Sequence, residues 1–411
     1  MGRITFILLS AIFLFSCSQE QSIDFEKLTK ENTNLAEIQY EKTITKSKST
    51  NKVPIFKTNE GELRLGNIYN WTSGFFAGNL WYMYELTGDE KWKNEAIHYT
   101  EILDTIQFWT GNHDVGFMIF CSYGNGLRLS GNKDYEQVIV NTAESLSQRF
   151  NKNTGCIKSW NYRKNWDGVT EWFYPVIIDN MMNLEVMFEA SMISGNPKYK
   201  EIAITHANTT MKNHYRDDYS CYHVVDYDTI TGAVKDRATC QGFTDESSWS
   251  RGQAWGLYGY VLMYRYTKDD VYLDFAENIA AYIMNHPNMP EDHIPYWDYH
   301  VNQPGYQPVW DYNPDDFDEI LRDVSASVIA ASALMELAQY STDGQKYVDY
   351  AKETVVNVST PNYRATADED NYFLLKKSVG SIPHGGQLSV PLNYADYYFL
   401  ETLQRIRKYQ K

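Results

Sequence analysis

Apolar and polar positions along this chain follow one repeated pattern, which predicts a helical hairpin. Each unit has an apolar, aromatic-rich stretch, a short polar turn, and a stretch where Ala or Val recurs every three or four residues. The turns resemble one another and lie at 87–92, 130–135, 194–199, 267–272 and 342–347. Hairpins that cannot bury their own apolar faces must stack or close on one another.

The stretches can be counted as six apolar and six amphipathic. The apolar ones lie at 74–86, 115–129, 177–193, 251–266, 323–340 and 393–408. The amphipathic ones lie at 91–108, 134–150, 197–214, 270–286 and 345–356, with a sixth available within 23–46. The apolar set is rich in Gly, Ala, Trp, Tyr and Met, so it should form an inner ring covered by the amphipathic set.

A closed ring fits better than an open solenoid, because the last apolar stretch has no polar cap after it. We therefore expect an all-α fold, a six-hairpin toroid in one domain. Strand-like segments around 156–162 and 221–235 predict short β-hairpins on its rim.

The N-terminus predicts export. Residues 1–17 read MGRITFILLSAIFLFSC, an apolar run too short to span a membrane comfortably and typical of a signal peptide. The ending LFSC resembles a bacterial lipobox, which would make Cys17 the lipidated residue of a Gram-negative protein that is periplasmic or anchored to a membrane. An ordinary signal peptide cut nearby is the alternative. Residues 18–50 would hold a tether and the first outer helix, and 51–411 the toroidal domain.

Composition narrows the class of ligand. A net charge of −16, a pI near 5.0 and no basic stripe argue against nucleic acid as a partner. Aromatic residues make up 15% of the chain, which suits a cleft that stacks on sugars, although helix packing also uses them. Four cysteines lack metal-ligand spacing and are expected to be buried and free, with a disulfide allowed in an oxidising compartment: Cys121, Cys156, Cys221 and Cys240.

Candidate chemistry gathers at the starts of the predicted inner helices, which should all open on one face of the ring and carry partial positive charge. Asp179 lies among Val, Ile and Met, so its carboxyl should be desolvated and its pKa raised, as a general acid requires. Asp114 also begins an inner stretch and could equally be an N-cap. Asp323 is expected to be a plain N-cap.

A second pair of residues suggests anion binding. Arg251 and Trp255 are four residues apart and share a helix face with Ser248 and Gly252. A guanidinium beside an indole could hold a carboxylate attached to a ring. The alternative is a structural Arg stacked on Trp.

Seven segments resemble, in order, the unsaturated glucuronyl hydrolases of glycoside hydrolase family 88. They run between residues 65 and 407 and read NWTSGF (70–75), HDVGF (113–117), IDNMMNL (178–184), QGF (241–243), SRGQAWGLYG (250–259), IPHGG (382–386) and DYYFLE (396–401). This resemblance implies an (α/α)6 barrel, in agreement with the hairpin count.

The resemblance also implies a reaction. The family removes the terminal 4,5-unsaturated glucuronyl residue from oligosaccharides that polysaccharide lyases make, from glycosaminoglycan- or ulvan-type polymers. Protonation at C4 builds oxocarbenium character at C5, water adds there, and the resulting hemiketal opens. By resemblance Asp179 is the general acid and base, and Asp114 is the second essential carboxylate. The residues implied in substrate binding are Trp71, His223, Thr239, Gln241, Arg251, Trp255, Ser381 and His384. No metal or other cofactor is implied.

One position departs from the family pattern. Where the family reads Thr-His-Gln-Gly, this chain has Cys240 in place of the His. The change should alter substrate preference more than the reaction. Cys240 is not expected to be a nucleophile, since no activating base is evident near it. The segment 291–319 is expected to be a loop over the open face that shapes the site of the leaving sugar.

Three other functions fit parts of the sequence. A rhamnogalacturonyl hydrolase would share the fold and similar chemistry. A sugar epimerase of this architecture would need paired central histidines, which the sequence does not show. A non-catalytic, lipid-anchored glycan-binding protein would keep Trp71, Trp255 and Arg251 but need neither Asp114 nor Asp179.

Overall fold

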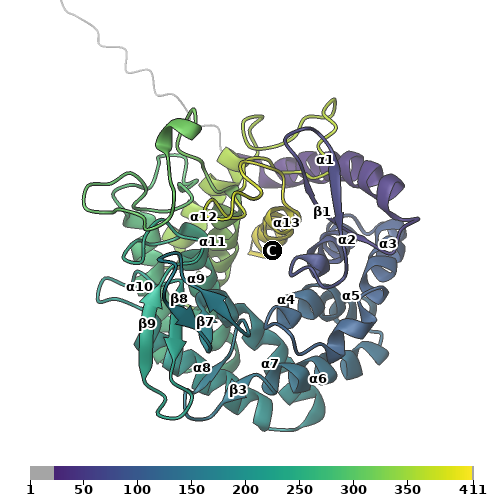
Figure 1. Cartoon of the computed structure of the whole chain (residues 1–411). Coiled ribbons are helices and arrows are strands. Elements are labelled where there is room, and N and C mark those ends of the chain that lie inside the picture. The colour runs from purple at the N-terminus through teal and green to yellow at the C-terminus, as the bar shows by residue number, and fades with distance from the viewer. Residues whose placement is uncertain (1–22, 410–411) are drawn as a thin grey trace, which may run out of the picture.

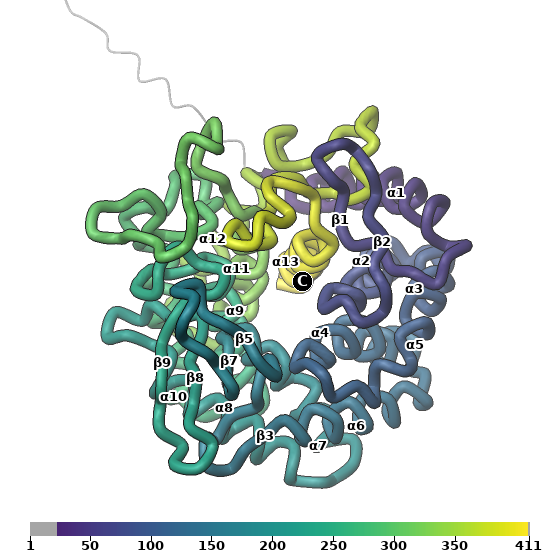
Figure 2. Tube along the Cα trace, in the orientation of Figure 1, coloured from purple at the N-terminus to yellow at the C-terminus, as the bar shows by residue number. Residues whose placement is uncertain are grey.

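The computed structural model describes residues 23–409, which form two concentric rings of helices (Figures 1 and 2). The inner ring consists of α2 (Ser73–Thr87), α4 (Val115–Ile119) continued by α5 (Asn125–Ser130), α7 (Leu184–Ser194), α9 (Ser250–Thr267), α11 (Val324–Leu337) and α13 (Asn393–Tyr409). The outer ring consists of α1 (Phe25–Ser47), α3 (Glu90–Glu101), α6 (Asp134–Ser147), α8 (Lys198–His214), α10 (Asp270–Asn285) and α12 (Gly344–Val358). The fold is an (α/α)6 toroid, as the sequence predicted.

Helical boundaries depart from the prediction at three places. The second inner stretch is interrupted by a π-helical turn, Phe120–Gly124. The third begins as the 3₁₀ helix η3 (Ile178–Asn183), which presents Asp179 before α7 starts. The stretch 91–108 divides into α3 and the 3₁₀ helix η1 (Asp104–Phe108). Periodicity cannot distinguish these tighter and wider turns from regular α-helix.

The ring closes between the two ends of the chain. α13 packs against both α11 and α2, and α1 packs against α2 and α13. Tyr40 of α1 donates a hydrogen bond to Asp396 of α13 at 2.8 Å. Gln39 donates to the carbonyls of Thr366 and Glu369. The first outer helix is therefore part of the toroid.

Small residues allow the inner helices to approach closely. A Cβ at Gly74 of α2 would lie 2.1 Å from the backbone oxygen of Met118 in α4. Only glycine fits there, which explains the density of small residues in the inner stretches.

The strands form short antiparallel sheets at the rim. They are β1 (Val53–Lys57) with β2 (Leu63–Gly66), β3 (Phe150–Asn151) with β4 (Cys156–Ile157), β5 (Arg163–Lys164) with β6 (Glu171–Trp172), and β7 (Pro175–Ile177) with β8 (Val224–Tyr227) and β9 (Val234–Ala238). The predicted rim hairpins are present. The sequence pattern did not predict β1, β2, β3, β6 or β7, and β5 lies just beyond the predicted segment 156–162.

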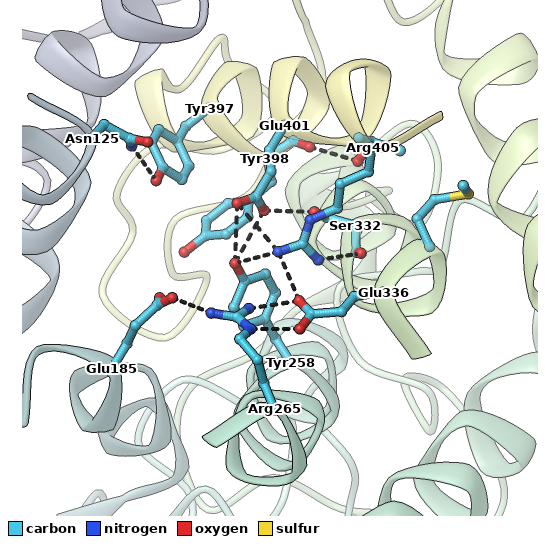
Figure 3. A network of polar contacts seen from close by, with 12 residues as sticks. Asn125, Glu185, Tyr258, Arg265, Ser332, Glu336, Tyr397, Tyr398, Glu401 and Arg405 are labelled. Atoms are coloured by element: carbon cyan, nitrogen blue, oxygen red, sulfur yellow. Dashed lines mark hydrogen bonds and ion pairs between the residues drawn. The ribbon is translucent and has the colours of Figure 1, made fainter. Parts of the chain in front are cut away.

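Charged side chains of four inner helices meet in a buried ionic network, from the C-terminal halves of α9, α11 and α13 and from the first turn of α7 (Figure 3). Arg265 of α9 forms a bidentate pair with Glu336 of α11, at 2.5 and 2.6 Å, and also bonds Glu185 of α7. Arg405 of α13 lies 3.0 Å from Glu336 and 3.4 Å from Glu401. Burial raises the pKa of Glu336, but the two arginines hold that pKa at about 2. The network joins α7, α9, α11 and α13.

This network lines a cavity of about 500 Å³ that contains none of the predicted site residues. Its acidic and basic side chains are largely paired with one another, as Arg128 is with Glu85. We therefore interpret this end of the toroid as structural.

Four cysteines of the described chain are free and buried, as predicted: Cys121, Cys156, Cys221 and Cys240. The signal segment and Cys17 lie outside the described residues. Of the helices within 23–409, none has the length and apolarity to cross a membrane.

Candidate active site

Asp179 lies at the junction between β7 and the third inner helical segment. β7 pairs with β8, and the N–H of Ile178 donates to the carbonyl of His223 at 3.1 Å, which fixes the backbone beside Asp179. The Asp179 side chain is 9% exposed, and its Oδ2 has no hydrogen-bond partner among the described residues. Burial raises the pKa of Asp179 to about 7, against the opposing effects of Arg251 and the Trp255 indole. The desolvation predicted from its apolar neighbours is confirmed.

His223, just before β8, faces the same carboxyl. Its Nδ1 accepts hydrogen bonds from the N–H groups of Cys240 and Gln241, at 2.9 and 3.2 Å. The ring proton therefore belongs on Nε2, which lies 3.8 Å from Oδ2 of Asp179. Burial, then the charge of Arg251, lowers the pKa of His223, so the ring is neutral. It can orient Asp179 as a hydrogen-bond donor through a small movement.

Asp114 lies at the start of α4, but its carboxyl does not cap that helix. Instead, Oδ1 lies 3.2 Å from Nε2 of His113. Asn183 accepts from the N–H of Phe117 at 3.0 Å and, with its orientation fixed in this way, donates to Nδ1 of His113 at 3.1 Å. The proton of His113 is thus placed on the nitrogen that faces Asp114.

The two carboxyls interact with each other. Asp114 is 8% exposed, and burial, followed by the charge of Asp179, raises the pKa of Asp114 to about 8. Two buried carboxyls that interact titrate as a pair and hold a proton near neutral pH. The site can therefore donate a proton to a substrate and keep a second carboxyl beside it.

Arg251 is more constrained than the sequence suggested. We expected a guanidinium free to pair with a carboxylate. Its four terminal N–H groups already have acceptors, and only Nε lacks one among the described residues. The acceptors are Asp323 Oδ2 (3.0 Å), the carbonyls of Val379 and Gly380, and Gln241 Oε1 (3.2 Å). A contact of Arg251 with a uronate stays a prediction.

Asp323 is not the plain N-cap that we expected. Its Oδ1 caps α11 by accepting from the N–H of Ser325 at 3.0 Å. Its Oδ2 forms the buried ion pair with Arg251. The Asp323 carboxylate therefore caps α11 and also bonds the first turn of the neighbouring inner helix, α9.

Aromatic rings form the wall next to the two acids. Trp71, partly exposed before α2, packs against Phe117 and Tyr394 with ring centroids 5.9 and 5.0 Å apart. Trp255 is fully buried and packs edge-on against Phe117 and Tyr398. Trp71 thus has a surface available to a sugar, whereas a ring contact for Trp255 stays a prediction.

The segment Thr239–Gly242 contacts two residues of the site, His223 and Arg251. Gln241 lies between Arg251 and His223 and is partly exposed. The Thr239 hydroxyl accepts from the N–H of Gly242 at 2.7 Å, so it stabilises a turn, and its contact with substrate is untested. Burial raises the pKa of the Cys240 thiol to about 11, which agrees with an unreactive side chain.

Ser381 and His384 lie on the loop before α13. The Ser381 hydroxyl and Nδ1 of His384 are 2.5 Å apart, and Nε2 of His384 lies 4.0 Å from the Cys240 sulfur. His384 thus lies beside the residue that departs from the family pattern. Its direct role with substrate stays a prediction.

The segment 286–323 is a long loop, as expected for 291–319, with one 3₁₀ turn, η4 (Pro314–Asp316). It packs at the N-terminal end of α9, where Ser250 donates to the carbonyl of Trp297 at 2.9 Å. The buried Asp298 accepts from the N–H of Phe243 at 2.9 Å. Within the described residues no cluster of three or more His, Cys, Asp or Glu could hold a metal.

Sequence reasoning missed residues whose hydrogen bonds join segments of the site that are far apart in the sequence. Asn183 bonds His113, whose Nε2 lies 3.2 Å from Asp114, although both residues were quoted only as parts of motifs. Arg163 bonds His384 and was not singled out at all. A lone Arg in a two-residue strand gives no periodic signal.

A six-hairpin toroid with a buried carboxyl pair and an aromatic wall at one end belongs to the class of carbohydrate-active hydrolases. Comparison of the sequence with known protein families agrees with this class, because residues 42–411 match the model of Glycosyl Hydrolase Family 88. The chain belongs to that family and is a glycoside hydrolase of the unsaturated glucuronyl hydrolase type.

Three relatives indicate how close the similarity is. An unsaturated glucuronyl hydrolase of Formosa agariphila is 42% identical over 337 residues, which cover 82% of this chain and 80% of the relative. An unsaturated chondroitin disaccharide hydrolase of Streptococcus agalactiae is 31% identical over 358 residues, which cover 83% of this chain and 84% of that protein. A crystal structure of an unsaturated glucuronyl hydrolase specific for heparin has a TM-score of 0.86 and 44% identity. The match covers 94% of this chain and 98% of that one.

Proposed function

We propose that this hydrolase removes the terminal 4,5-unsaturated glucuronyl residue from glycosaminoglycan- or ulvan-type oligosaccharides by hydrating the C4=C5 bond. The observation that carries the proposal is the buried pair Asp179 and Asp114, whose pKa values are raised to about 7 and 8. A group that protonates carbon near neutral pH must hold its proton in that range. The relatives named unsaturated glucuronyl hydrolase and unsaturated chondroitin disaccharide hydrolase support the substrate class.

In this mechanism protonated Asp179 gives its proton to C4, and positive charge develops at C5 and the ring oxygen. The resulting Asp179 carboxylate stabilises that charge. Asp179 then accepts a proton from the water that attacks C5. The hemiketal opens, C1 becomes an aldehyde, and the leaving sugar departs with its oxygen. His223 and Asn183 act as positioning residues.

The direct test is the ultraviolet absorbance of the unsaturated uronate, which disappears when the double bond is hydrated. The purified protein should clear this absorbance from lyase-made disaccharides and release the saturated sugar. Digests of chondroitin, heparin and ulvan, each measured separately, identify the parent polymer. An unsaturated rhamnogalacturonyl disaccharide is the comparison substrate for the alternative hydrolase. Absence of turnover on all unsaturated glucuronyl substrates would contradict the proposal.

The pH profile should have an alkaline limb near the pKa of the acid. The donor is protonated Asp179, so turnover should fall about tenfold per unit as the pH rises above about 7. Asp114, with its pKa raised to about 8, keeps its proton while Asp179 titrates. Asp114→Asn resembles that protonated form, so the variant should be slower but keep the limb near the same pH.

The measurement is kcat from pH 5 to 9 for the parent and Asp114→Asn. If Asp114 were the ionised partner instead, removing its charge would lower the pKa of Asp179 and move the limb to lower pH. A shift of that kind would contradict the assignment of the proton.

We also propose export and lipid attachment at Cys17, on the sequence of residues 1–17 alone. In a Gram-negative host the full chain should fractionate with membranes, and Cys17→Ala should lose incorporation of labelled fatty acid. Incorporation that persists in the variant would contradict attachment at this residue.

A further inference from the structure

Arg163 is a cation on the inner side of the rim. It belongs to β5, which Figure 2 shows on the ring-facing side of the β7–β8–β9 sheet. Its guanidinium bonds Nε2 of His384 and lies 5.4 Å from the ring centroid of Trp160. The side chain is partly exposed, so it is held from two sides and keeps donors toward solvent.

Arg163 is connected to the acid by a short series of contacts. His384 Nε2 lies 4.0 Å from the Cys240 sulfur, the Cys240 N–H donates to His223, and His223 lies 3.8 Å from Asp179. Burial and the charge of Arg251 lower the pKa of His223, and Arg163 adds to the same shift. Arg163 is therefore within electrostatic range of the site, yet separated from the proton donor.

The histidine beside it does not compete for an anion. Arg163 can only donate, so Nε2 of His384 must accept and Nδ1 must carry the proton that is donated to Ser381. His384 is thus neutral, and burial and Arg163 lower its pKa to about 4. The cluster has one positive charge, on Arg163.

That charge has no protein counter-ion. No ion pair within residues 23–409 includes Arg163, in a chain whose net charge is −16. The other arginine of the site, Arg251, has already used its terminal N–H groups on protein acceptors. A partly exposed guanidinium without a carboxylate partner, close to an acidic site, is suited to an anionic oxygen group, which it can bind with two parallel hydrogen bonds.

We propose that Arg163, with His384 fixing its orientation, binds an anionic oxygen group of the oligosaccharide and thereby sets substrate preference. The group is the uronate carboxylate or a sulfate ester on the leaving sugar. This proposal rests on the proposed function. It also gives Cys240 a role, because the thiol occupies the space beside His384 where the family pattern has a second histidine.

The test compares Arg163→Gln with Lys164→Gln. Lys164 is the next residue of the same strand and is exposed. Its substitution by Gln removes one positive charge, as Arg163→Gln does. KM and kcat are measured on two unsaturated disaccharides, one unsulfated and one sulfated on the leaving sugar. Arg163→Gln should raise KM about 10- to 100-fold with little change in kcat, because a charged hydrogen bond to substrate is lost. Lys164→Gln should match the parent.

The two substrates identify the group. An equal rise in KM on both disaccharides indicates the carboxylate, and a rise on the sulfated one alone indicates the sulfate ester. Unchanged KM on both overturns the proposal. Calorimetric titration of the same disaccharides into Asp179→Asn, with and without Arg163→Gln, measures binding without turnover. If the parent has no turnover, the proposed function fails, whereas equal binding by the two proteins overturns the role of Arg163 alone.

Discussion

Asp179→Asn is expected to reduce turnover of an unsaturated disaccharide by about 10²–10⁴-fold, the usual contribution of a positioned acid. The amide keeps the size of the side chain but has no proton acidic enough to transfer to carbon. Since the carboxyl is buried and, with a pKa of about 7, is already about half neutral at neutral pH, the substitution should leave the fold intact. The loss of substrate absorbance gives kcat, and circular dichroism and thermal unfolding check the fold.

The matched control for this variant is Asp217→Asn, which removes an exposed carboxylate away from the site. It should keep the activity of the parent. If Asp179→Asn cleared the absorbance as fast as the parent, Asp179 would not be the acid.

Arg265→Met is expected to have the largest effect on stability, lowering the free energy of unfolding by about 3–5 kcal/mol. The variant leaves Glu336 without its bidentate partner and Glu185 without its cation. The buried charges then have to be protonated or hydrated, at the expense of the folded state. Chemical denaturation monitored by tryptophan fluorescence gives the change.

Lys198→Met is the control, because Lys198 pairs with Glu144 on the surface, where both side chains are more than 40% exposed. Such a pair contributes about 0–1 kcal/mol. Equal destabilisation by the two variants would mean that the network in Figure 3 is no stronger than a surface pair. Arg265→Met should stay active at low temperature, because the network contains neither Asp114 nor Asp179.

Much of the fold could be predicted because the hairpin repeat encodes both rings. Apolar stretches with Gly and Ala can only be inner helices, and close contacts such as Gly74 on Met118 show why. The 3₁₀ start at Asp179 and the π turn at Phe120 were not predictable, because they are set by packing between neighbours in the ring.

The features of the site also fall into those that the local sequence predicts and those that it does not. Burial of Asp179 follows from its neighbours in sequence, and the structure confirms it. Arg251 bonds Asp323, which is 72 positions away in the sequence. It also bonds the carbonyls of Val379 and Gly380, which are 128 and 129 positions away. The ionic network at the other end joins α7, α9, α11 and α13 in the same long-range manner. Local pattern contains no information about such partners.

The closure of the ring by its first and last helices has a consequence for how the protein is made. Tyr40 and Asp396 are separated by 356 positions, and Gln39 reaches carbonyls 327 and 330 positions away. During synthesis α1 leaves the ribosome long before its packing partners exist, so the complete toroid can form only after the final helix emerges. Removing the final helix would leave the earliest one without a surface to cover.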